Sequence, residues 1–319
     1  MSETVLVMAS VDDGEADRVL NELHRRGHKA VLLDLSWFPQ HARIVGQLGS
    51  SGWEGHLATP YTTIRFEDIR AVYHRRCPPF EPASTMNEHE RRFAMVESRF
   101  GLGGILTSLS ARWISHPAAM ADAEYKPLQL AIAAQVGLPL PDTWIGNDPE
   151  RARSFVTDQA NGTVYKALMH KLVSDQSAVG LIHTNTVDVD EIDERVGAAP
   201  HQFQELIHAD HDVRALVTGN GCEAVAIKAR HGSAFLDYRH HYEELRYERI
   251  HLDYDLVAGS QQMLARLNLA SGVFDFAVTS TGETVFYEVN PAGQWAWLEE
   301  ETGAPMTTLI CDALIGATT

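Results

Sequence analysis

The chain connects its strands in two different ways, and this difference limits the folds that it can adopt. Near the start, the apolar run Thr4–Ala9 is followed by an amphipathic segment, Asp13–Gly27, and by a second apolar run, Ala30–Leu35. A strand, a helix and a strand in this order predict a parallel β-α-β unit. The first turn lacks the GxGxxG pattern, which argues against a dinucleotide site there.

Toward the other end, tight turns that contain Gly separate the strands instead. The two turns are Gly219-Asn220-Gly221 and Ser280-Thr281-Gly282. Turns this short join antiparallel neighbours. The strands that flank them are Val213–Thr218, Ala224–Lys228, Val273–Thr279 and Val285–Val289. The sequence therefore predicts a mixed α/β and α+β architecture, with a parallel sheet first and an antiparallel sheet last.

We divide the chain into three lobes, at residues 1–114, 115–200 and 201–319. The first lobe should also contain a hairpin region, a strand and a long helix: Gln47–Arg65, Ile69–His74 and Glu88–Leu109. The second should contain a helix through Tyr125-Lys126-Pro127 to Val136, a helix starting at Asp148-Pro149, an acidic helix Val187–Val196, and strands Pro141–Ile145, Thr163–Ala167 and Val179–Thr186. We assign the strand Phe203–Ile207 and the helix Asp255–Leu267 to the last lobe.

The composition excludes several classes of partner. The chain has 319 residues, with 26 Lys and Arg against 43 Asp and Glu, so its net charge is −17. This charge argues against nucleic-acid binding, and an anionic ligand would need a locally basic pocket or a metal ion.

The first residues lack the basic segment of a signal peptide, and no apolar run is long enough to cross a membrane. Cys77, Cys222 and Cys311 are too widely spaced for a zinc site or a disulfide framework, so we expect a cytoplasmic protein.

The segment VFYEVNPAGQW, residues 285–295, places polar groups on an apolar strand. Strict alternation predicts Glu288 and Asn290 on one face together with Phe286. The preceding strand carries Asp275, which the hairpin can bring beside Glu288 and Asn290. Packed carboxylates repel one another unless a cation joins them, and Mg²⁺ prefers a few carboxylates together with phosphate oxygens. The alternative is an edge strand with a solvated Glu and an Asn-Pro turn.

A phosphate ligand also needs positive charge, and several basic residues are candidates to supply it. Lys166, Arg214 and Lys228 each lie in a run of apolar residues, and Lys126 and Arg239 are further candidates. Each alone fits a surface lysine or a structural ion pair. Several of them on facing strands favour an anion pocket.

In chain order, these polar residues resemble the pattern of the ATP-grasp ligases. The pattern comprises Lys126, Lys166, Gln204-Glu205-Leu206-Ile207, Asp212-Val213-Arg214, Asp275 and Glu288-Val289-Asn290-Pro291. The chain is most similar to the branch that matures ribosomal peptides, the microviridin-type or graspetide ligases. That closer resemblance is carried by Val72-Tyr73-His74-Arg75-Arg76, Arg112-Trp113-Ile114-Ser115-His116-Pro117, Asp237-Tyr238-Arg239 and Asn290-Pro291-Ala292-Gly293-Gln294-Trp295. The sequence departs from the branch at His74 and Tyr238, where an aromatic or apolar residue is expected.

The resemblance implies a fold and a set of roles. The fold is a parallel α/β pre-ATP-grasp lobe, a central ATP-grasp lobe and an antiparallel-sheet lobe, with ATP between the last two. Lys126 and Lys166 would contact the α- and β-phosphates, and Asp210 or Asp212 would reach the ribose. The residues implied to bind adenine are Gln204, Glu205, Leu206 and Ile207. Asp275, Glu288 and Asn290 would hold two Mg²⁺ ions, while Arg214 and Arg239, with Lys228 as a further catalytic candidate, would stabilise the transferring phosphoryl group.

The implied reaction is an ATP-dependent ligation within a ribosomal precursor peptide. Asp or Glu carboxylates of the peptide would be activated as acyl phosphates and condensed with Ser or Thr hydroxyls, or Lys amines, to give macrocyclic esters or amides. A leader segment would dock on the central lobe, where His170–Gln176 is either a lid or leader contact or a mobile surface loop. The resemblance also suggests a homodimer.

Two other functions fit the same motifs. One is an ATP-grasp ligase that adds amino acids to a protein tail or a small acid. The other is an ATP-binding regulator without turnover, against which the intact set of Asp275, Glu288, Asn290 and Arg214 argues. An adjacent reading frame rich in Thr, Asp and Glu would favour the peptide cyclase over the amino-acid ligase.

Overall fold

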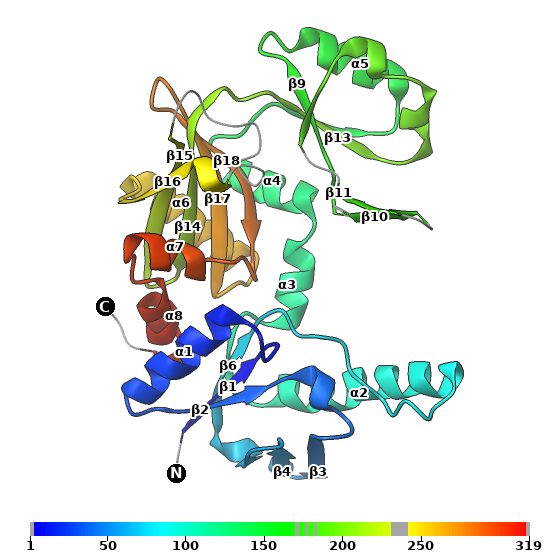
Figure 1. The fold of residues 1–319 in the computed structure, drawn as a ribbon, viewed down its shortest axis with the longest axis vertical. Coiled ribbons are helices and arrows are strands. Elements are labelled where there is room, and N and C mark those ends of the chain that lie inside the picture. The colour runs from blue at the N-terminus through cyan, green and yellow to red at the C-terminus, as the bar shows by residue number, and fades with distance from the viewer. Residues whose placement is uncertain (1–2, 170–171, 176–177, 182–183, 231–241, 317–319) are drawn as a thin grey trace.

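The computed structural model describes residues 3–169, 172–175, 178–181, 184–230 and 242–316 (Figure 1). Its first lobe contains the predicted parallel unit. Strands β1 (Thr4–Met8), β2 (Lys29–Leu33), β6 (Ile69–His74) and β7 (Arg112–Ile114) form a parallel sheet in the order β2-β1-β6-β7. Helix α1 (Gly14–Arg25) begins at Asp13, whose side chain accepts a hydrogen bond from the Ala16 amide, and it buries Val19 and Leu23.

The same lobe carries the predicted hairpin region and long helix. Strands β3 (Arg43–Gly49), β4 (Gly52–Ala58) and β5 (Thr63–Arg65) form a second, antiparallel sheet. Helix α2 (Glu88–Ser108) starts with a capping box in which Asn87 and Glu90 bond to each other's backbone amides. Such a cap satisfies orphan amides of the first turn and fixes where the helix begins.

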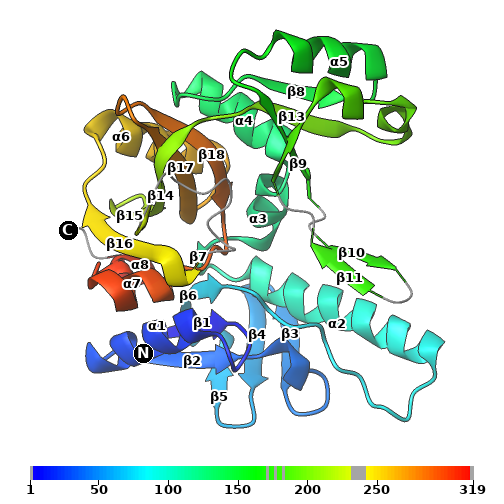
Figure 2. The ribbon, with the colours of Figure 1, turned by 45° about the horizontal axis from the view of Figure 1, so that its top comes forward.

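The predicted helix through Tyr125-Lys126-Pro127 is two helices, α3 (Pro117–Ala123) and α4 (Lys126–Gln135). Proline has no amide proton, so Pro127 cannot continue the hydrogen-bond ladder back to Ala123. The side chain of Gln129 donates to the Ala123 carbonyl instead. The break turns α4 away from the direction of α3 (Figure 2), and α4 packs against α6 and β18 of the last lobe.

The central sheet differs from the prediction in three respects. Strands β8 (Thr143–Gly146), β9 (Thr163–Lys166), β12 (Asn185–Val187) and β13 (His201–Glu205) form it in the antiparallel order β12-β9-β13-β8. The strand that we assigned to the last lobe, β13, therefore belongs here, because Phe203 packs under helix α5 (Pro149–Asp158). The strand predicted at Val179–Thr186 is divided between β11 (Ala178–Leu181), which pairs with β10 (Leu172–Asp175), and β12. The predicted acidic helix is two short 3-10 turns, Val189–Glu191 and Glu194–Ala198.

The last lobe is built on the predicted antiparallel sheet. Its strands are β14 (Ala209–Thr218), β15 (Gly221–Ala229), β16 (Leu245–Ile250), β17 (Ser271–Thr279) and β18 (Thr284–Asn290), in the order β16-β15-β14-β17-β18. The sequence prediction missed β16. Helix α6 (Tyr254–Arg266) is confirmed, and α7 (Ala296–Thr302) and α8 (Met306–Ile315) follow the sheet.

The two faces of this sheet bury against different parts of the chain. One face places Val213, Phe274 and Phe276 in a core shared with α3, α4 and α6. The other places Leu216, Val225 and Ile227 in a core that includes α8 and the first parallel sheet. Helix α8 lies against α1 (Figure 1), so the first and last lobes share one continuous core.

Candidate functional site

The β17–β18 hairpin brings together the three oxygen-bearing side chains that the sequence singled out. Asp275 lies directly opposite Glu288 in the strand register. The Asn290 amide nitrogen donates to Asp275 Oδ2 and to Glu288 Oε1, at 3.2 Å in each case. The predicted convergence of Asp275, Glu288 and Asn290 is therefore present.

One detail of the strand pattern was wrong. The register shifts between Asp275 and Phe276, so that Phe276 pairs with Phe286 and Tyr287 is the extra residue of a β-bulge. Phe286 consequently lies in the apolar core, on the face opposite to Glu288. A bulge adds one residue to one strand and so reverses the alternation beyond it. This irregularity allows β18 to bury Phe286 and Val289 while Glu288 and Asn290 point away from that core.

Two cations from different elements neutralise these carboxylates. Arg214, opposite Asp275 on β14, places Nη1 2.8 Å from Asp275 Oδ1 and 3.1 Å from Oδ2. Lys126, the first residue of α4, places Nζ 3.0 Å from Glu288 Oε2. The four side chains are 10–17% exposed, so the cluster is largely but not completely desolvated.

Helix α4 also holds the outer edge of β18, through a residue that the sequence analysis did not identify. Gln129 is buried, and its amide group accepts from the Val289 N–H and donates to the Val289 carbonyl, both at 2.9 Å. The bonds flank Val289 between Glu288 and Asn290, and so fix the backbone that carries both side chains. The only sequence clue was a polar residue two positions after Pro127.

Lys166 links the central lobe to the same hairpin. It lies on β9, and its Nζ is 3.9 Å from the centre of the Tyr287 ring on β18, a cation–π distance. Burial raises the pKa of Tyr287, and the negative charge of Asp212 raises it further. Asp212 lies two residues before Arg214 on β14 and therefore on the same face. Lys126 and Arg214 thus bond the carboxylate pair, while Lys166 contacts the neighbouring Tyr287 and Asp212 shares the face of Arg214.

The central sheet contributes unsatisfied polar atoms on the face that carries Lys166. Lys166 pairs with Gln202 in the register, and Gln204 follows on the same face. Gln204 donates to Thr143 Oγ1 at 2.9 Å. Within the described residues, the Oε1 atoms of Gln202 and Gln204 are buried and have no hydrogen-bond partner. Buried acceptors of this kind are uncommon and can accept from a water molecule or from a ligand.

Other predicted binding residues are used differently. The Glu205 carboxylate lies on the opposite face from Gln204 and accepts a hydrogen bond from Asn161 at 2.9 Å. The Leu206 amide donates to Gly162 O, and the Ile207 carbonyl accepts from Ala209 N. The position of Glu205 therefore does not support recognition of a base by its side chain. The backbone of this segment remains the candidate for binding the base.

Lys228 is separated from the cluster by the sheet itself. Ile227 pairs with Asp212, so the next residue, Lys228, faces the opposite side from Asp212 and Arg214. There it forms an ion pair with Glu248 at 2.8 Å. Its position does not support a catalytic role. Arg239 and Tyr238 lie outside the described residues, as do His170, Lys171 and Gln176 of the proposed lid segment.

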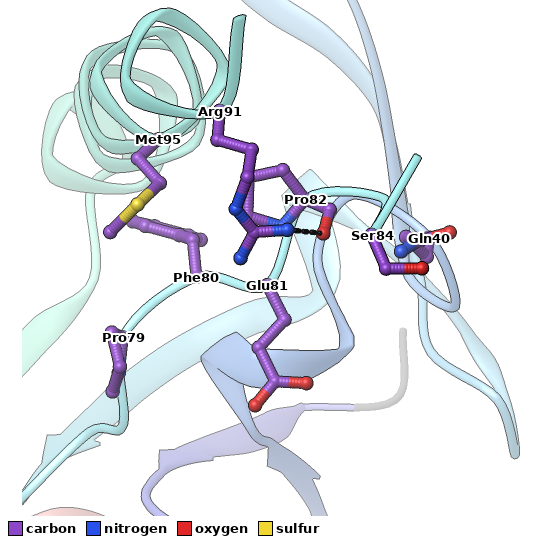
Figure 3. A pocket seen from close by; sticks show the side chains of 8 residues that line it. All are labelled: Gln40, Pro79, Phe80, Glu81, Pro82, Ser84, Arg91 and Met95. Atoms are coloured by element: carbon purple, nitrogen blue, oxygen red, sulfur yellow. Dashed lines mark hydrogen bonds between the residues drawn. The ribbon is translucent and has the colours of Figure 1, made fainter. Parts of the chain in front are cut away.

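A separate pocket lies in the first lobe, between α2 and the segment that follows β6 (Figure 3). Its volume is about 450 Å³. Arg91 closes one side by donating from Nη1 to Pro82 O at 3.1 Å. The lining residues are Gln40, Pro79, Phe80, Glu81, Pro82, Ser84, Arg91 and Met95, and none of them belongs to the predicted site.

The oxygen-bearing side chains at the hairpin suit a hard cation whose remaining coordination positions are filled by oxygens of a ligand. Within the described ranges, no three His, Cys, Asp or Glu side chains group closely enough to hold a metal ion. An ion here would therefore use Asp275, Glu288, the amide oxygen of Asn290 and further oxygens such as those of phosphate. This is the arrangement that Mg²⁺ commonly adopts with nucleotides.

Comparisons with known proteins identify the fold. Residues 4–121 match the family model of the MvdD pre-ATP grasp domain. No curated protein sequence matches the chain. The macrocyclase MdnB from Microcystis aeruginosa MRC is 27% identical, with a TM-score of 0.78 over 98% of this chain and 99% of that one.

Two further solved structures are similar over nearly their whole length. The macrocyclase MdnC from the same organism, bound with precursor peptide MdnA, is 24% identical, with a TM-score of 0.84 over 98% of this chain and 100% of that one. A RiPP-associated ATP-grasp ligase from Chryseobacterium gregarium, in complex with ADP and a leader and core peptide, is 23% identical, with a TM-score of 0.89 over 99% and 98% of the two chains. The resemblance drawn from the sequence is confirmed: the chain has the ATP-grasp fold of these ligases, with an MvdD-type pre-ATP-grasp domain at its start.

Proposed function

We propose that this ATP-grasp ligase uses ATP and Mg²⁺ to join a carboxylate of a peptide substrate to a hydroxyl or an amine of the same peptide. The observation that carries the proposal is the convergence of Asp275, Glu288 and Asn290 on one hairpin, with Lys126 and Arg214 bonded to their carboxylates. One buried and one largely buried carboxylate, with two cations from distant segments, are costly to assemble for stability alone. They suit a site that binds a metal and phosphates.

ATP and Mg²⁺ are supported by the residues and by a similar enzyme. The ATP-grasp ligase PsnB has been solved with its minimal precursor, Mg and ADP, and with AMPPNP. In this chain, Asp275, Glu288 and Asn290 would hold the metal, which supplies charge neutralisation for the phosphates. Lys126 and Lys166 approach the hairpin from α4 and β9, so we assign them to the α- and β-phosphates. Both would exchange their present partners, Glu288 and the Tyr287 ring, for phosphate oxygens.

The nucleoside would lie against β13. The buried acceptors of Gln202 and Gln204 are close to the hinge segment 204–207, where an adenine amine could donate. The Glu205 and Leu206 amides already donate to Asp142 O and Gly162 O, so we assign the base to the remaining backbone groups of Glu205, Leu206 and Ile207. We assign the ribose to Asp212. These assignments place ATP between the central and last lobes.

The chemistry needs no nucleophile from the protein. A carboxylate of the substrate attacks the γ-phosphorus of ATP, which forms an acyl phosphate and releases ADP. A hydroxyl or amine then attacks the acyl carbon, loses its proton and displaces phosphate, leaving an ester or an amide. Arg214 and Arg239 would stabilise charge on the transferring group, so catalysis rests on positioning and charge neutralisation.

A ribosomal precursor peptide is the substrate that the comparisons favour. MdnC and PsnB have both been solved with precursor peptides. The leader of such a peptide would dock on the central lobe, near β10 and β11, while an acidic, Thr-rich core would enter the hairpin site. A ligase that adds amino acids to a protein tail or small acid uses the same first half-reaction and is the second candidate.

Intact-mass analysis tests the proposal. The protein would be incubated with ATP, Mg²⁺ and a small peptide encoded beside its gene that is rich in Thr, Asp and Glu. Loss of one water per ring, dependent on ATP, is the expected result. A gain of amino-acid masses in a mixture with free amino acids would favour the second candidate. Absence of any mass change together with absence of ADP formation would contradict both.

We also propose that the protein is a homodimer. Helix α2 exposes an apolar stripe of Phe93, Val96 and Phe100, of which Phe93 is 68% and Phe100 71% exposed. A contiguous exposed apolar patch on a helix is typical of an interaction surface. Light scattering should give twice the 35.4 kDa mass of one chain, and Phe93→Ser with Phe100→Ser should give the single mass. A wild-type protein of single mass would contradict the proposal.

We propose the cytoplasm as its compartment. Cys77, Cys222 and Cys311 are all free thiols, as expected where thiols are kept reduced. In the part of the chain that the structure describes, every helix is too short or too polar to cross a membrane.

A further inference from the structure

The first lobe contains a buried ion cluster at the carboxyl end of its parallel sheet. Arg75 follows β6, and its guanidinium lies 3.0 Å from Glu15 Oε2 and 3.3 Å from Asp13 Oδ1. Asp13 and Glu15 belong to the turn that joins β1 to α1. These side chains are only 3–7% exposed. Burial disfavours the charged guanidinium, but Tyr73, Asp13 and Glu15 outweigh it and raise the pKa of Arg75.

The same cluster reaches across to the segment that follows the metal-binding strand. Arg75 Nη1 donates to Gly293 O at 3.3 Å. Glu15 Oε1 accepts from Trp295 N at 2.9 Å and from Ala296 N at 3.2 Å. The backbone of residues 293–296, which begins three residues after Asn290, is therefore held by side chains of the first lobe.

The last lobe holds this segment from the other side. Arg214, which bonds Asp275 through Nη1, donates from Nε to Gln294 O at 3.0 Å. Gly293 leaves no room for a side chain, because a Cβ there would lie 2.6 Å from Val273 Cβ and 3.2 Å from Arg214 Nη2. The position of this segment is therefore closely constrained, and a shift of the segment would also move Arg214.

We propose that Arg75, Asp13 and Glu15 are positioning residues that set the geometry of Arg214 and Asn290 through residues 293–296. This inference rests on the proposed function, since it assigns these three residues to the same reaction. We assign none of them as a ligand of the metal or of the phosphates. They hold residues 293–296, to which Arg214 bonds. The geometry of the metal- and phosphate-binding edge of the sheet therefore depends on contacts with the first lobe.

A purely structural ion cluster is the alternative, and the chain offers a matched control for it. Arg26, directly after α1, bonds Asp312 on α8 and Glu22, and so also links the first and last lobes through a largely buried ion pair. It has no bond to residues 293–296. Arg26→Met should lower the melting temperature without changing the site, whereas Arg75→Gln should change both.

The test is the Mg²⁺ dependence of AMPPNP binding, measured by titration calorimetry with wild type, Arg75→Gln and Arg26→Met. We expect Arg75→Gln to raise the Mg²⁺ concentration for half-maximal binding by about tenfold or more, and Arg26→Met to leave it within twofold. Glu15→Gln keeps an oxygen for Trp295 N and Ala296 N but loses the charge, so it should fold and shift the midpoint in the same direction by a smaller factor.

Three results would overturn the inference. One is a wild-type midpoint in both Arg75→Gln and Glu15→Gln. Another is an equal shift in Arg26→Met, which would indicate a general loss of stability. An unfolded Arg75→Gln leaves Glu15→Gln as the deciding variant, and a wild-type midpoint there would overturn it. Wild-type protein that does not bind AMPPNP with Mg²⁺ would instead remove the proposed function itself.

Discussion

The two faces of the five-stranded sheet differ in chemistry at the edge formed by β14, β17 and β18. On one face, Phe274, Phe276 and Phe286 pack together under α4 and α6. On the other, at the β14–β17–β18 edge, Arg214, Asp275 and Glu288 lie side by side. Apolar side chains on both faces, away from this charged edge, already provide the cores that the sheet needs. The charged face is therefore retained for a reason other than stability, because buried ion pairs are commonly neutral or unfavourable compared with apolar packing.

The difference between the faces depends on one bulged residue. Without the bulge at Tyr287, Phe286 and Glu288 would share a face, and either the aromatic core or the carboxylate cluster would be lost. The bulge lets one strand serve both. Variants on the charged face should therefore act on activity, and matched variants on the other face should not.

The largest effect is expected from Glu288→Gln combined with Asn290→Ala. Removing one preorganised charged contact commonly costs 10²–10³ in kcat, so two should lower turnover by about 10³-fold or more. The fold should remain, because Asp275 keeps Arg214. Turnover is measured as ADP release, and circular dichroism checks the fold. Glu248→Gln, an exposed carboxylate on the other face, is the control; normal turnover of the double variant would remove the metal assignment.

Gln129→Leu tests whether α4 supports the charged face. The substitution leaves the Val289 N–H, the Val289 carbonyl and the Ala123 carbonyl without their partner. Each unsatisfied buried group costs about 1–3 kcal/mol, so we expect the free energy of unfolding to fall by about 3–5 kcal/mol in urea denaturation. Gln261→Leu, which removes bonds to Thr218 O and Gly219 O at a half-exposed site, should cost less than about 1 kcal/mol. Equal losses in the two variants would contradict the role of Gln129.

Lys126→Met and Lys228→Met compare a lysine on each face. Lys126 bonds Glu288, whereas Lys228 bonds the exposed Glu248 on the opposite face. We expect Lys126→Met to raise the activation free energy by about 3–4 kcal/mol, measured as kcat/KM for ATP. Lys228→Met should change kcat/KM by less than about twofold, in keeping with an exposed ion pair. A large loss in Lys228→Met would restore the catalytic role that the sequence suggested.

The smallest effect is expected at His74, on the pH dependence of the free energy of unfolding. Burial, with the nearby His116, lowers the pKa of His74 to about 4 from an ordinary value of 6.5. The unfolded chain then binds more protons between these values, so the free energy of unfolding should fall by up to about 3 kcal/mol as pH drops through this window. His74→Phe should flatten this slope, and His89→Gln, at an exposed position, should not. A slope unchanged in His74→Phe would show that other groups cause it.

The sequence predicted the parts of the site that follow from local chemistry. The turn Ser280-Thr281-Gly282 fixes the hairpin, and the hairpin alone brings Asp275 to Glu288. The face of the sheet on which Lys228 lies could also be predicted from the sequence, because the Gly219-Asn220-Gly221 turn sets the β14–β15 register. Counting along that register places Lys228 and Arg214 on opposite faces.

Other features depend on contacts that no local pattern records. The bulge at Tyr287 follows from the need to bury Phe286 against Phe276 on another strand. The membership of β13 in the central sheet depends on pairing with β8 and β9. Gln129 and Arg75 bond backbone groups 160 and 218 residues away, and a backbone partner leaves no trace in the identity of the residue that carries it.

The central claim is that the β17–β18 hairpin is the site of Mg²⁺ and nucleotide. Titration calorimetry with AMPPNP, in Mg²⁺ and in EDTA, tests this claim without a peptide substrate. We predict tight binding by wild type in Mg²⁺ and at least tenfold weaker binding in EDTA. The Glu288→Gln, Asn290→Ala variant should bind weakly in both. Strong binding by that variant that still depends on Mg²⁺ would contradict the account, because the metal would then lie elsewhere.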